Sequence, residues 1–363
     1  MLNCLPVGRK ASIYTFKDFL AILLIYHTQK NTNKVKEQTK IGVVGVGHLG
    51  KHHVEHFHTI KEADLVGTYD IDKNRSENIS NLYGIQSFKS IDALLKEVDA
   101  VSIVTPTPEH KSVAIKCIEK SKHIFIEKPI TATVADADEL ISLAKAKKTI
   151  IQVGHIERLN PALLPLKKYD INPRFIEIQR LAPYMERGSD VPVVLDLMIH
   201  DIDLVLTFVS SPIKEIKATG ISIMTKSVDI ANARISFENG VVANLTSSRV
   251  AKDRVRKMKI FQQDLYITVD LLMSLTEVYR AVDQNNNNLK TIMSAPLESN
   301  GHKRQILYEK PTIVQKDALR MELKNFIGAT RKKEQPIVDG EAGKQALDLA
   351  IKIQNKILEG FNT

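Results

Sequence analysis

The sequence predicts an α/β protein of two domains, the first built on a doubly wound parallel sheet and the second on an antiparallel sheet. A chain of 363 residues is too long for one typical core of roughly 100–200 residues. Short apolar runs alternate with helical stretches through residues 41–153, which is typical of a parallel sheet covered on both faces. Apolar and polar residues then alternate through residues 216–260 around Asn239-Gly240, which predicts antiparallel strands and a type I′ hairpin.

The composition is that of an ordinary globular chain, with 43% apolar and 26% charged residues. It excludes disordered, collagen-like and membrane-embedded proteins. The two cysteines, Cys4 and Cys117, form no CxxC pair, so we expect a reducing, cytoplasmic compartment and no bound metal. The net charge of +9 is unusual and is compatible with nucleic acid, a membrane surface or an anionic substrate as partner.

Much of this charge lies in an N-terminal extension, residues 1–39, which we expect to be disordered. Residues 1–40 hold seven basic and two acidic residues, a net charge of +5 that leaves +4 for the rest. The apolar run at 19–26 is far shorter than the roughly 20 residues that cross a bilayer, and no small-residue cleavage site follows it. The alternative is a basic membrane-surface anchor. We expect no membrane span and, without a basic recognition helix, no nucleic-acid partner.

The segment after this extension indicates a dinucleotide site, because an apolar strand runs directly into a GxGxxG motif. Gly45 permits the tight turn, Gly47 lets the backbone approach a pyrophosphate, and Gly50 lets the following helix pack closely on the strand. The amides at the helix N-terminus then face the phosphates. His48 and Leu49, between the last two glycines, are expected to contact the cofactor as well.

A second strand, 64–69, ends in Asp70, where a carboxylate accepts hydrogen bonds from the adenosine ribose. The same carboxylate repels a 2′-phosphate, which favours NAD over NADP, although Lys73 and Arg75 nearby leave NADP open.

The chain continues with alternating elements up to residue 153. We expect strands at 100–104, 123–126 and 150–153, with helices at 74–83, 91–96, 109–120 and 134–147. The loop after strand 100–104 lies at the carboxyl edge of the sheet, where open α/β sheets bind their ligands. It supplies four candidate cofactor contacts: Thr105, Pro106, Thr107 and His110.

Five histidines cluster on the first helix: His48, His52, His53, His56 and His58. The i, i+4 spacing of His48, His52 and His56 is compatible with a zinc site. Against zinc, no cysteine lies nearby, and a helix that points its N-terminus at a pyrophosphate is a poor place for a divalent cation. We expect a partly exposed helix face instead.

The triplet Glu127-Lys128-Pro129 follows strand 123–126 without a break, so Lys128 lies at the active edge of the sheet and Glu127 beside the cofactor. A cis bond before the proline would turn the lysine into the cleft. The alternative is a solvated lysine that only caps a strand.

The segment 193–208 is apolar nearly all round and predicts a buried helix, yet Asp196, His200 and Asp203 fall on one stripe. Asp196 can accept a hydrogen bond from one ring nitrogen of His200 and leave the other nitrogen as a general base. The alternative is a core histidine beside a helix-stabilising acid.

Together, the GxGxxG motif, the Glu127-Lys128-Pro129 triplet and the Asp196-xxx-His200 helix resemble the Gfo/Idh/MocA oxidoreductases. These enzymes pair an N-terminal Rossmann domain with a C-terminal domain on an open, mostly antiparallel sheet. The resemblance implies that Lys128 and His200 are the catalytic pair, with Asp196 supporting His200. We place the NAD-binding domain at 40–158, a substrate and oligomerisation domain at 159–337, and a helix that packs back on the first domain at 338–363.

The family's glycine-rich run before the Asp-xxx-His helix is absent here, which counts against the simple polyol dehydrogenases. Segments 153–161, 195–203 and 243–249 are similar instead to the subgroup that oxidises UDP-N-acetylglucosamine at C3. That resemblance implies a 3-keto product, which an aminotransferase partner converts to a 3-amino sugar nucleotide for lipid A or related glycans. Candidate contacts to the sugar and diphosphate are His155, Asn160, Arg180, Tyr184 and Arg187.

Two other functions stay open: an NAD-dependent dehydrogenase of a free sugar or inositol, and a non-catalytic NAD-sensing regulator. The first differs by its substrate alone, and the second has no need of Lys128 and His200 together. One face of the antiparallel sheet should cover the 196–208 helix and leave the other for a subunit partner, which predicts a homodimer or homotetramer. The polar run 283–288 predicts an excursion loop.

Overall fold

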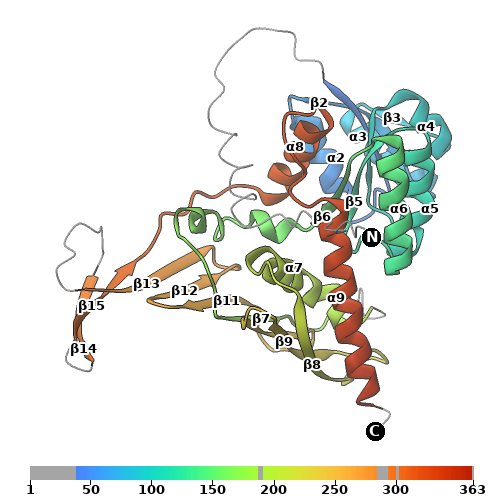
Figure 1. Cartoon of the computed structure of the whole chain (residues 1–363). Coiled ribbons are helices and arrows are strands. Elements are labelled where there is room, and N and C mark those ends of the chain that lie inside the picture. The colour runs from blue at the N-terminus through green and yellow to red at the C-terminus, as the bar shows by residue number, and fades with distance from the viewer. Residues whose placement is uncertain (1–37, 187–190, 284–292, 300–301, 362–363) are drawn as a thin grey trace, which may run out of the picture.

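The computed structural model describes residues 38–186, 191–283, 293–299 and 302–361, which form two sheets with separate cores (Figure 1). The predicted fold class is confirmed: a parallel sheet covered by helices precedes a larger, mostly antiparallel sheet. The first strand begins at Thr39, one residue before the predicted domain boundary. The extension at 1–37 and the core of the predicted excursion loop, 284–288, lie outside the described residues.

The first sheet has the strand order β3-β2-β1-β4-β5-β6, and all of its pairs are parallel. The order reverses between β1 and β4, so a crevice opens at the carboxyl ends of these two strands. The strands are β1 (Thr39–Val44), β2 (Ala63–Tyr69), β3 (Gln86–Ser87), β4 (Ala100–Ile103), β5 (His123–Glu127) and β6 (Ile151–Gly154).

Three helices of this domain begin at a residue whose side chain caps them. Asp72, Ser90 and Thr133 each accept a hydrogen bond from the amide three residues on, which satisfies one unpaired amide at the helix start. The helices are α2 (Gly50–Thr59), α3 (Lys73–Tyr83), α4 (Ile91–Glu97), α5 (Thr107–Glu119) and α6 (Val134–Lys147). All lie within two residues of the predicted bounds where bounds were predicted.

The second sheet has the order β14-β15-β13-β12-β11-β7-β10-β9-β8. Among the described strands every neighbouring pair in it is antiparallel except β7 and β10. Its strands are β7 (Phe175–Leu181), β8 (Ile213–Ile221), β9 (Ile230–Phe237), β10 (Val242–Ser248), β11 (Val255–Gln262), β12 (Leu265–Asp270), β13 (Leu275–Asp283), β14 (Met293–Ser299) and β15 (His302–Glu309).

The hairpin between β9 and β10 differs from the predicted type I′ turn. Phe237 pairs with Val241, which leaves the three residues 238–240 in the loop. Gly240 has a φ of 84°, whereas Asn239 is not among the residues with positive φ. A type I′ turn needs positive φ at both central residues, so this is a three-residue loop that ends in a left-handed glycine.

One face of the second sheet covers a helix that starts with a π turn, η4 (Val194–Met198), and continues as α7 (Ile199–Phe208). Short 3-10 turns, η2 (Ile156–Leu159) and η3 (Leu164–Lys168), connect β6 to this domain.

Two C-terminal helices join the domains. The helix α8 (Ala318–Thr330) places Phe326 in one core of the first domain, together with Phe125 and Phe57. The chain therefore returns to the first domain before residue 337, where we predicted the boundary. The last helix, α9 (Gly340–Glu359), contacts α6 and β6 on one side and α7 and β8 on the other (Figure 1). It therefore packs on both domains and not on the first alone.

Candidate active site

The glycine turn after β1 has the shape that a pyrophosphate needs. Gly45 has a φ of 86°, and a Cβ there would lie 2.7 Å from the Val104 carbonyl oxygen. A Cβ on Gly50 would lie 1.9 Å from the Gly45 oxygen, so no other residue allows this approach of helix to turn. A Cβ on Gly47 would meet nothing within 4 Å, which leaves open space in front of the turn.

Asp70 holds this turn from the end of β2. Its carboxylate accepts hydrogen bonds from the amides of Val46 at 2.8 Å and Asp72 at 2.9 Å, and Arg75 lies 3.4 Å away. The side chain is buried at the edge of the turn, where an adenosine ribose would lie in such a fold. Leu49, at 45% exposure, stands at the start of α2, next to His48.

The loop after β4 supplies a second wall. Pro106 precedes α5, whose first residue is Thr107. The Thr105 hydroxyl is buried and has no hydrogen-bond partner among the described residues. His110 is a correction: its ring is buried and contacts the carbonyls of Thr105 and Pro129, both at 2.9 Å, so it joins two loops and has no surface left for a cofactor.

These residues fit a dinucleotide. The open space at Gly47 admits a pyrophosphate in front of the α2 amides, and the unsatisfied Thr105 hydroxyl is a polar group that awaits a partner at the same edge.

Lys128 reaches from the end of β5 toward the second domain, and the Lys128–Pro129 peptide bond is cis. Its Nζ donates a hydrogen bond to the Asp196 carbonyl at 2.6 Å and lies 3.5 Å from Asp196 Oδ1. Burial lowers the pKa of Lys128 below its ordinary value, although the charges of Asp196 and Glu127 oppose that effect. The two domains therefore meet at this amino group.

Glu127 depends on a residue whose role we did not predict. His53, one of the five clustered histidines, is buried and places Nε2 3.1 Å from Glu127 Oε1 and Nδ1 2.8 Å from the Ser102 hydroxyl. Burial acts to raise the pKa of Glu127, but its contacts with His53 and Lys128 outweigh burial and lower it.

The other helix histidines have separate surroundings: His52 lies beside Glu55, His56 beside Asp317 and His58 beside Tyr83. Within the described ranges, no group of three or more His, Cys, Asp or Glu residues could hold a metal ion.

His200 and His155 form the centre of the site. Their rings lie 6.3 Å apart between centroids at an angle of 81°. His200 Nδ1 and both nitrogens of His155 are buried without hydrogen-bond partners among the described residues. Burial, and then the positive charges of Lys128 and Arg180, lower the pKa of His200 well below its ordinary value. At neutral pH the His200 ring is therefore uncharged and able to accept a proton.

The hydrogen bond that we predicted between Asp196 and His200 is not formed: within the described part of the chain His200 Nδ1 has no partner, and Asp196 turns to Lys128. Asp196 lies in the π turn, where the wider turn changes which side chains face one another along the helix. Asp203, the third residue of the predicted stripe, is buried and accepts two hydrogen bonds from Arg158, at 2.6 and 2.8 Å.

Two predicted substrate contacts are corrected. Arg180 is buried and its guanidinium is taken up by Asp201, at 2.7–3.0 Å, and Glu157, at 2.9 Å. The Asn160 amide donates to Glu157 and to the Leu271 carbonyl, while its oxygen accepts from the Ala162 amide. All three guanidinium nitrogens of the buried Arg180 and both amide hydrogens of Asn160 are engaged by protein groups, so we no longer assign either side chain to the substrate.

The other predicted contacts differ in position. Tyr184 is 39% exposed on the segment that follows β7, and Arg187 lies outside the described residues. Two arginines that we did not predict as contacts have partners or effects at the site. Arg256, on β11, is 46% exposed and lies 3.4 Å from Glu157, and its charge acts on His200. Arg249 lies 4.0 Å from Asp196 and donates a hydrogen bond to the Val191 carbonyl. The alternation Arg254-Val-Arg256 at the start of a strand was the available signal.

A dinucleotide turn on a parallel sheet, with a lysine and an uncharged histidine brought together from two domains, defines a two-domain NAD-dependent oxidoreductase. Residues 39–155 match the model of an oxidoreductase family with an NAD-binding Rossmann fold, and residues 178–267 match a GFO/IDH/MocA C-terminal domain. The chain belongs to the Gfo/Idh/MocA family of oxidoreductases, and its cofactor is NAD. Within the described residues no helix is long and apolar enough to span a membrane.

Individual relatives fit this assignment. The chain is 35% identical over 316 residues to a UDP-N-acetylglucosamine 3-dehydrogenase of Acidithiobacillus ferrooxidans, which covers 87% of this chain and 96% of that protein. It is 26% identical to a myo-inositol 2-dehydrogenase of Thermotoga maritima, over 88% of this chain and 96% of that one. The solved structure of the Acidithiobacillus enzyme superposes with a TM-score of 0.79 at 34% identity, covering 88% of this chain and 98% of that chain.

Proposed function

We propose that this enzyme oxidises the C3 hydroxyl of UDP-N-acetylglucosamine to a ketone. The observation that carries the proposal is the similarity, over nearly the whole chain, to a dehydrogenase of that substrate. The charge of the site supports it, because positive side chains from both domains surround His200. A nucleotide sugar brings a diphosphate that such charges attract, whereas a free sugar or inositol does not.

Arg256 is the side chain best suited to the diphosphate. It is 46% exposed, so its guanidinium can reach a ligand, while the buried Arg180 beneath it stays bound to Asp201 and Glu157. We also keep Tyr184 and His155 as proposed contacts to the sugar or nucleotide, since Tyr184 is exposed on the segment after β7 and the His155 ring nitrogens lack partners among the described residues.

His200 and Lys128 would divide the proton chemistry. The glycine turn at Gly45, Gly47 and Gly50 would hold NAD, which would supply the hydride acceptor for C3. His200, uncharged because of burial and neighbouring positive charge, accepts the proton of the C3 hydroxyl. Lys128 stabilises the negative charge that develops on that oxygen, and its hydrogen bond to the Asp196 carbonyl holds its amino group in place.

The test is reduction of NAD, followed by absorbance, with UDP-N-acetylglucosamine, UDP-glucose, N-acetylglucosamine and myo-inositol as separate substrates. We expect turnover with the first and little with the free sugars, and a 3-keto product by mass spectrometry and NMR. Turnover of free sugars or inositols with none of any nucleotide sugar would overturn the proposal. His200→Ala should lose roughly 100-fold or more in kcat, which is the usual contribution of a general base.

An inositol dehydrogenase is the second candidate, because relatives of that name match at 26–28% identity. The same substrate panel separates the two candidates.

The product chemistry suggests partners. A 3-keto sugar nucleotide is the substrate that an aminotransferase would convert to a 3-amino sugar, and we propose such an enzyme as the next step, toward lipid A or related glycans. Purified aminotransferase of that class, added with an amino donor, should remove the 3-keto product and so increase the amount of NAD that is reduced.

We further propose a homodimer or homotetramer formed through the second sheet.

A further inference from the structure

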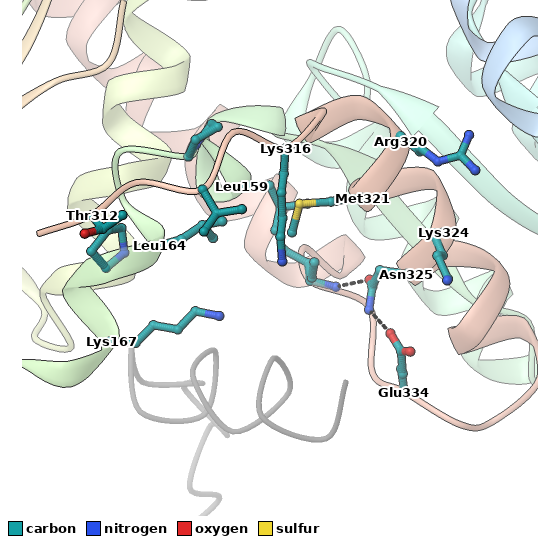
Figure 2. A pocket seen from close by; sticks show the side chains of 14 residues that line it. Leu159, Leu164, Lys167, Thr312, Lys316, Arg320, Met321, Lys324, Asn325 and Glu334 are labelled. Carbon is teal, nitrogen blue, oxygen red and sulfur yellow. Dashed lines mark hydrogen bonds between the residues drawn. The ribbon is translucent and has the colours of Figure 1, made fainter. Parts of the chain in front are cut away.

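A cavity of about 380 Å³ lies between the 3-10 turns after β6 and helix α8, and none of the active-site side chains lines it. Its volume falls within the range of small-molecule sites, roughly 300–1,000 Å³. Most of its wall is apolar, with lysines at the rim (Figure 2). The apolar lining consists of Leu159, Pro161, Leu164, Pro165, Val314, Met321 and Ile337.

Lys167 and Lys316 direct their amino groups toward the same space (Figure 2). Neither forms an ion pair with any described residue, and the charge that acts on Lys167 is that of Lys316. Burial, followed by the charge of Lys316, lowers the pKa of Lys167 to about 8. Two ammonium groups brought together beside an apolar wall are unfavourable unless an anion joins them.

The other charged and amide side chains of the wall already have partners. Arg320 turns away and donates to Thr59, and Lys324 lies 3.7 Å from Glu62. Glu334 accepts a hydrogen bond from Asn325 at 2.8 Å, on the far side of the cavity from Lys167. The two lysines are therefore the groups that a ligand would meet.

We propose that this cavity is a second ligand site that binds an organic anion, with a carboxylate or phosphate head at Lys167 and Lys316 and a hydrocarbon chain on the apolar wall. The anionic head supplies the counter-charge that the described residues do not, and the chain covers the apolar lining. The proposal does not depend on the sugar that the active site oxidises.

Isothermal titration calorimetry of the full chain at saturating NAD tests this site, with octanoate, octyl phosphate, octanol, acetate and inorganic phosphate as ligands. We expect one of the two octyl anions to bind, and its head group tells whether the natural ligand is a carboxylate or a phosphate. Octanol, acetate and inorganic phosphate should bind at least about tenfold more weakly, because each lacks the head or the chain. Absence of binding by both octyl anions, or equal binding of octanol, overturns the proposal.

Variants locate the site. Lys167→Gln and Lys316→Gln should each weaken the binding of the octyl anion about tenfold. Lys168 is the next residue in the chain but does not line the cavity, so Lys168→Gln should leave the affinity unchanged. All three positions are at least partly exposed, so the melting temperature and NAD affinity should stay constant. Unchanged affinity in both Lys167→Gln and Lys316→Gln would overturn the assignment.

Proton uptake gives an independent measurement. An anion stabilises the charged form of Lys167 and raises its pKa, so at pH 8, where this lysine is partly neutral, binding should take up protons. Titrations in two buffers of different ionisation enthalpy should show that uptake in the wild type and not in Lys167→Gln. Equal uptake in both proteins would exclude Lys167 from the site.

Discussion

The surroundings of His200 determine the pH range in which it can accept a proton. Burial lowers its pKa first, and the charges of Lys128, Arg180 and Arg256 lower it further. Arg256→Gln removes one positive neighbour without touching His200. Because the imidazolium is then less disfavoured, the pKa of His200 should rise, and the base should be protonated at a higher pH than in the wild type.

The measurement is kcat/KM against pH from 5 to 9. We expect the acid limb of the profile to move to higher pH in Arg256→Gln, and KM for the nucleotide sugar to rise if Arg256 also meets the diphosphate. An acid limb that stays in place would show that His200 does not control it. Lys96→Gln, in the last turn of α4, removes one positive charge from another part of the first domain and is the control for a general charge effect.

Arg180 illustrates how a residue can matter to the site without touching a substrate. Arg180→Met would leave Asp201 buried without its counter-charge and Glu157 with Arg256 alone, and breaking a buried ion pair typically costs about 3–5 kcal/mol of folding free energy. Urea denaturation measures this loss. Arg234→Met, at an arginine exposed on β9 of the same sheet, should change stability by less than about 1 kcal/mol. Equal stability of the two variants would contradict the supporting role that we assign to Arg180.

At the scale of the element, two glycines of the same turn have different roles, one in folding and one in cofactor binding. A Cβ on Gly50 would lie 1.9 Å from the Gly45 oxygen, whereas a Cβ on Gly47 would meet no protein atom within 4 Å. Gly50→Ala should therefore lower both the melting temperature and NAD affinity. Gly47→Ala should keep the wild-type melting temperature and lose NAD affinity, because its methyl group fills the space in front of the turn.

Thermal melts and NAD titrations of both variants make the comparison. A Gly47→Ala protein that binds NAD as tightly as the wild type would mean that the pyrophosphate does not pass over this residue.

Elements of the first domain could be predicted well because their signals are local. Each strand is a short apolar run and each helix carries its own cap or period, so bounds agree within two residues where they were predicted. That Lys128 and His200 lie where the two domains meet follows from a motif in one segment for each, while their catalytic roles stay predictions.

The roles of Arg180, Asn160 and His110 could not be predicted in the same way, since they depend on partners from other segments. Arg180 meets Asp201, 21 positions away, and His110 meets the Pro129 carbonyl, 19 positions away. The sequence shows that these side chains can donate hydrogen bonds but does not tell whether their donors are already used. The π turn at Asp196 could not be predicted either, because the pattern was compared only with a regular helix of 3.6 residues per turn.

At the scale of the whole molecule, the site exists only while the two domains keep their relative position. Lys128 comes from the first domain and Asp196 and His200 from the second. The ion pair between Arg158 and Asp203, at 2.6 Å, ties η2 to α7, and α9 packs on both domains. These contacts hold the two domains in the relative position that the 2.6 Å hydrogen bond from Lys128 to the Asp196 carbonyl requires.

The second sheet turns one face to this core and the other outward, and a row of aromatic rings crosses the outward face. The register pairs Phe175 with Phe261, Phe261 with Tyr266, Tyr266 with Tyr279, and Tyr279 with Tyr308. Neighbouring ring centroids lie 4.8–5.6 Å apart, and all five rings are half-buried. Alternate residues such as Ile176 and Ile260 point into the core, so the row lies on the opposite face.

A row of partly exposed aromatic side chains on a wide sheet is typical of an interface between subunits. We therefore expect Tyr266→Glu, in the middle of the row, to place a charge within the proposed dimer contact and release monomers, as burial of an unpaired carboxylate is costly. Light scattering after gel filtration measures the mass, and Lys96→Glu on α4 should keep the wild-type mass. If wild type is a monomer at tens of micromolar, or Tyr266→Glu keeps the wild-type mass, the subunits do not meet through this row.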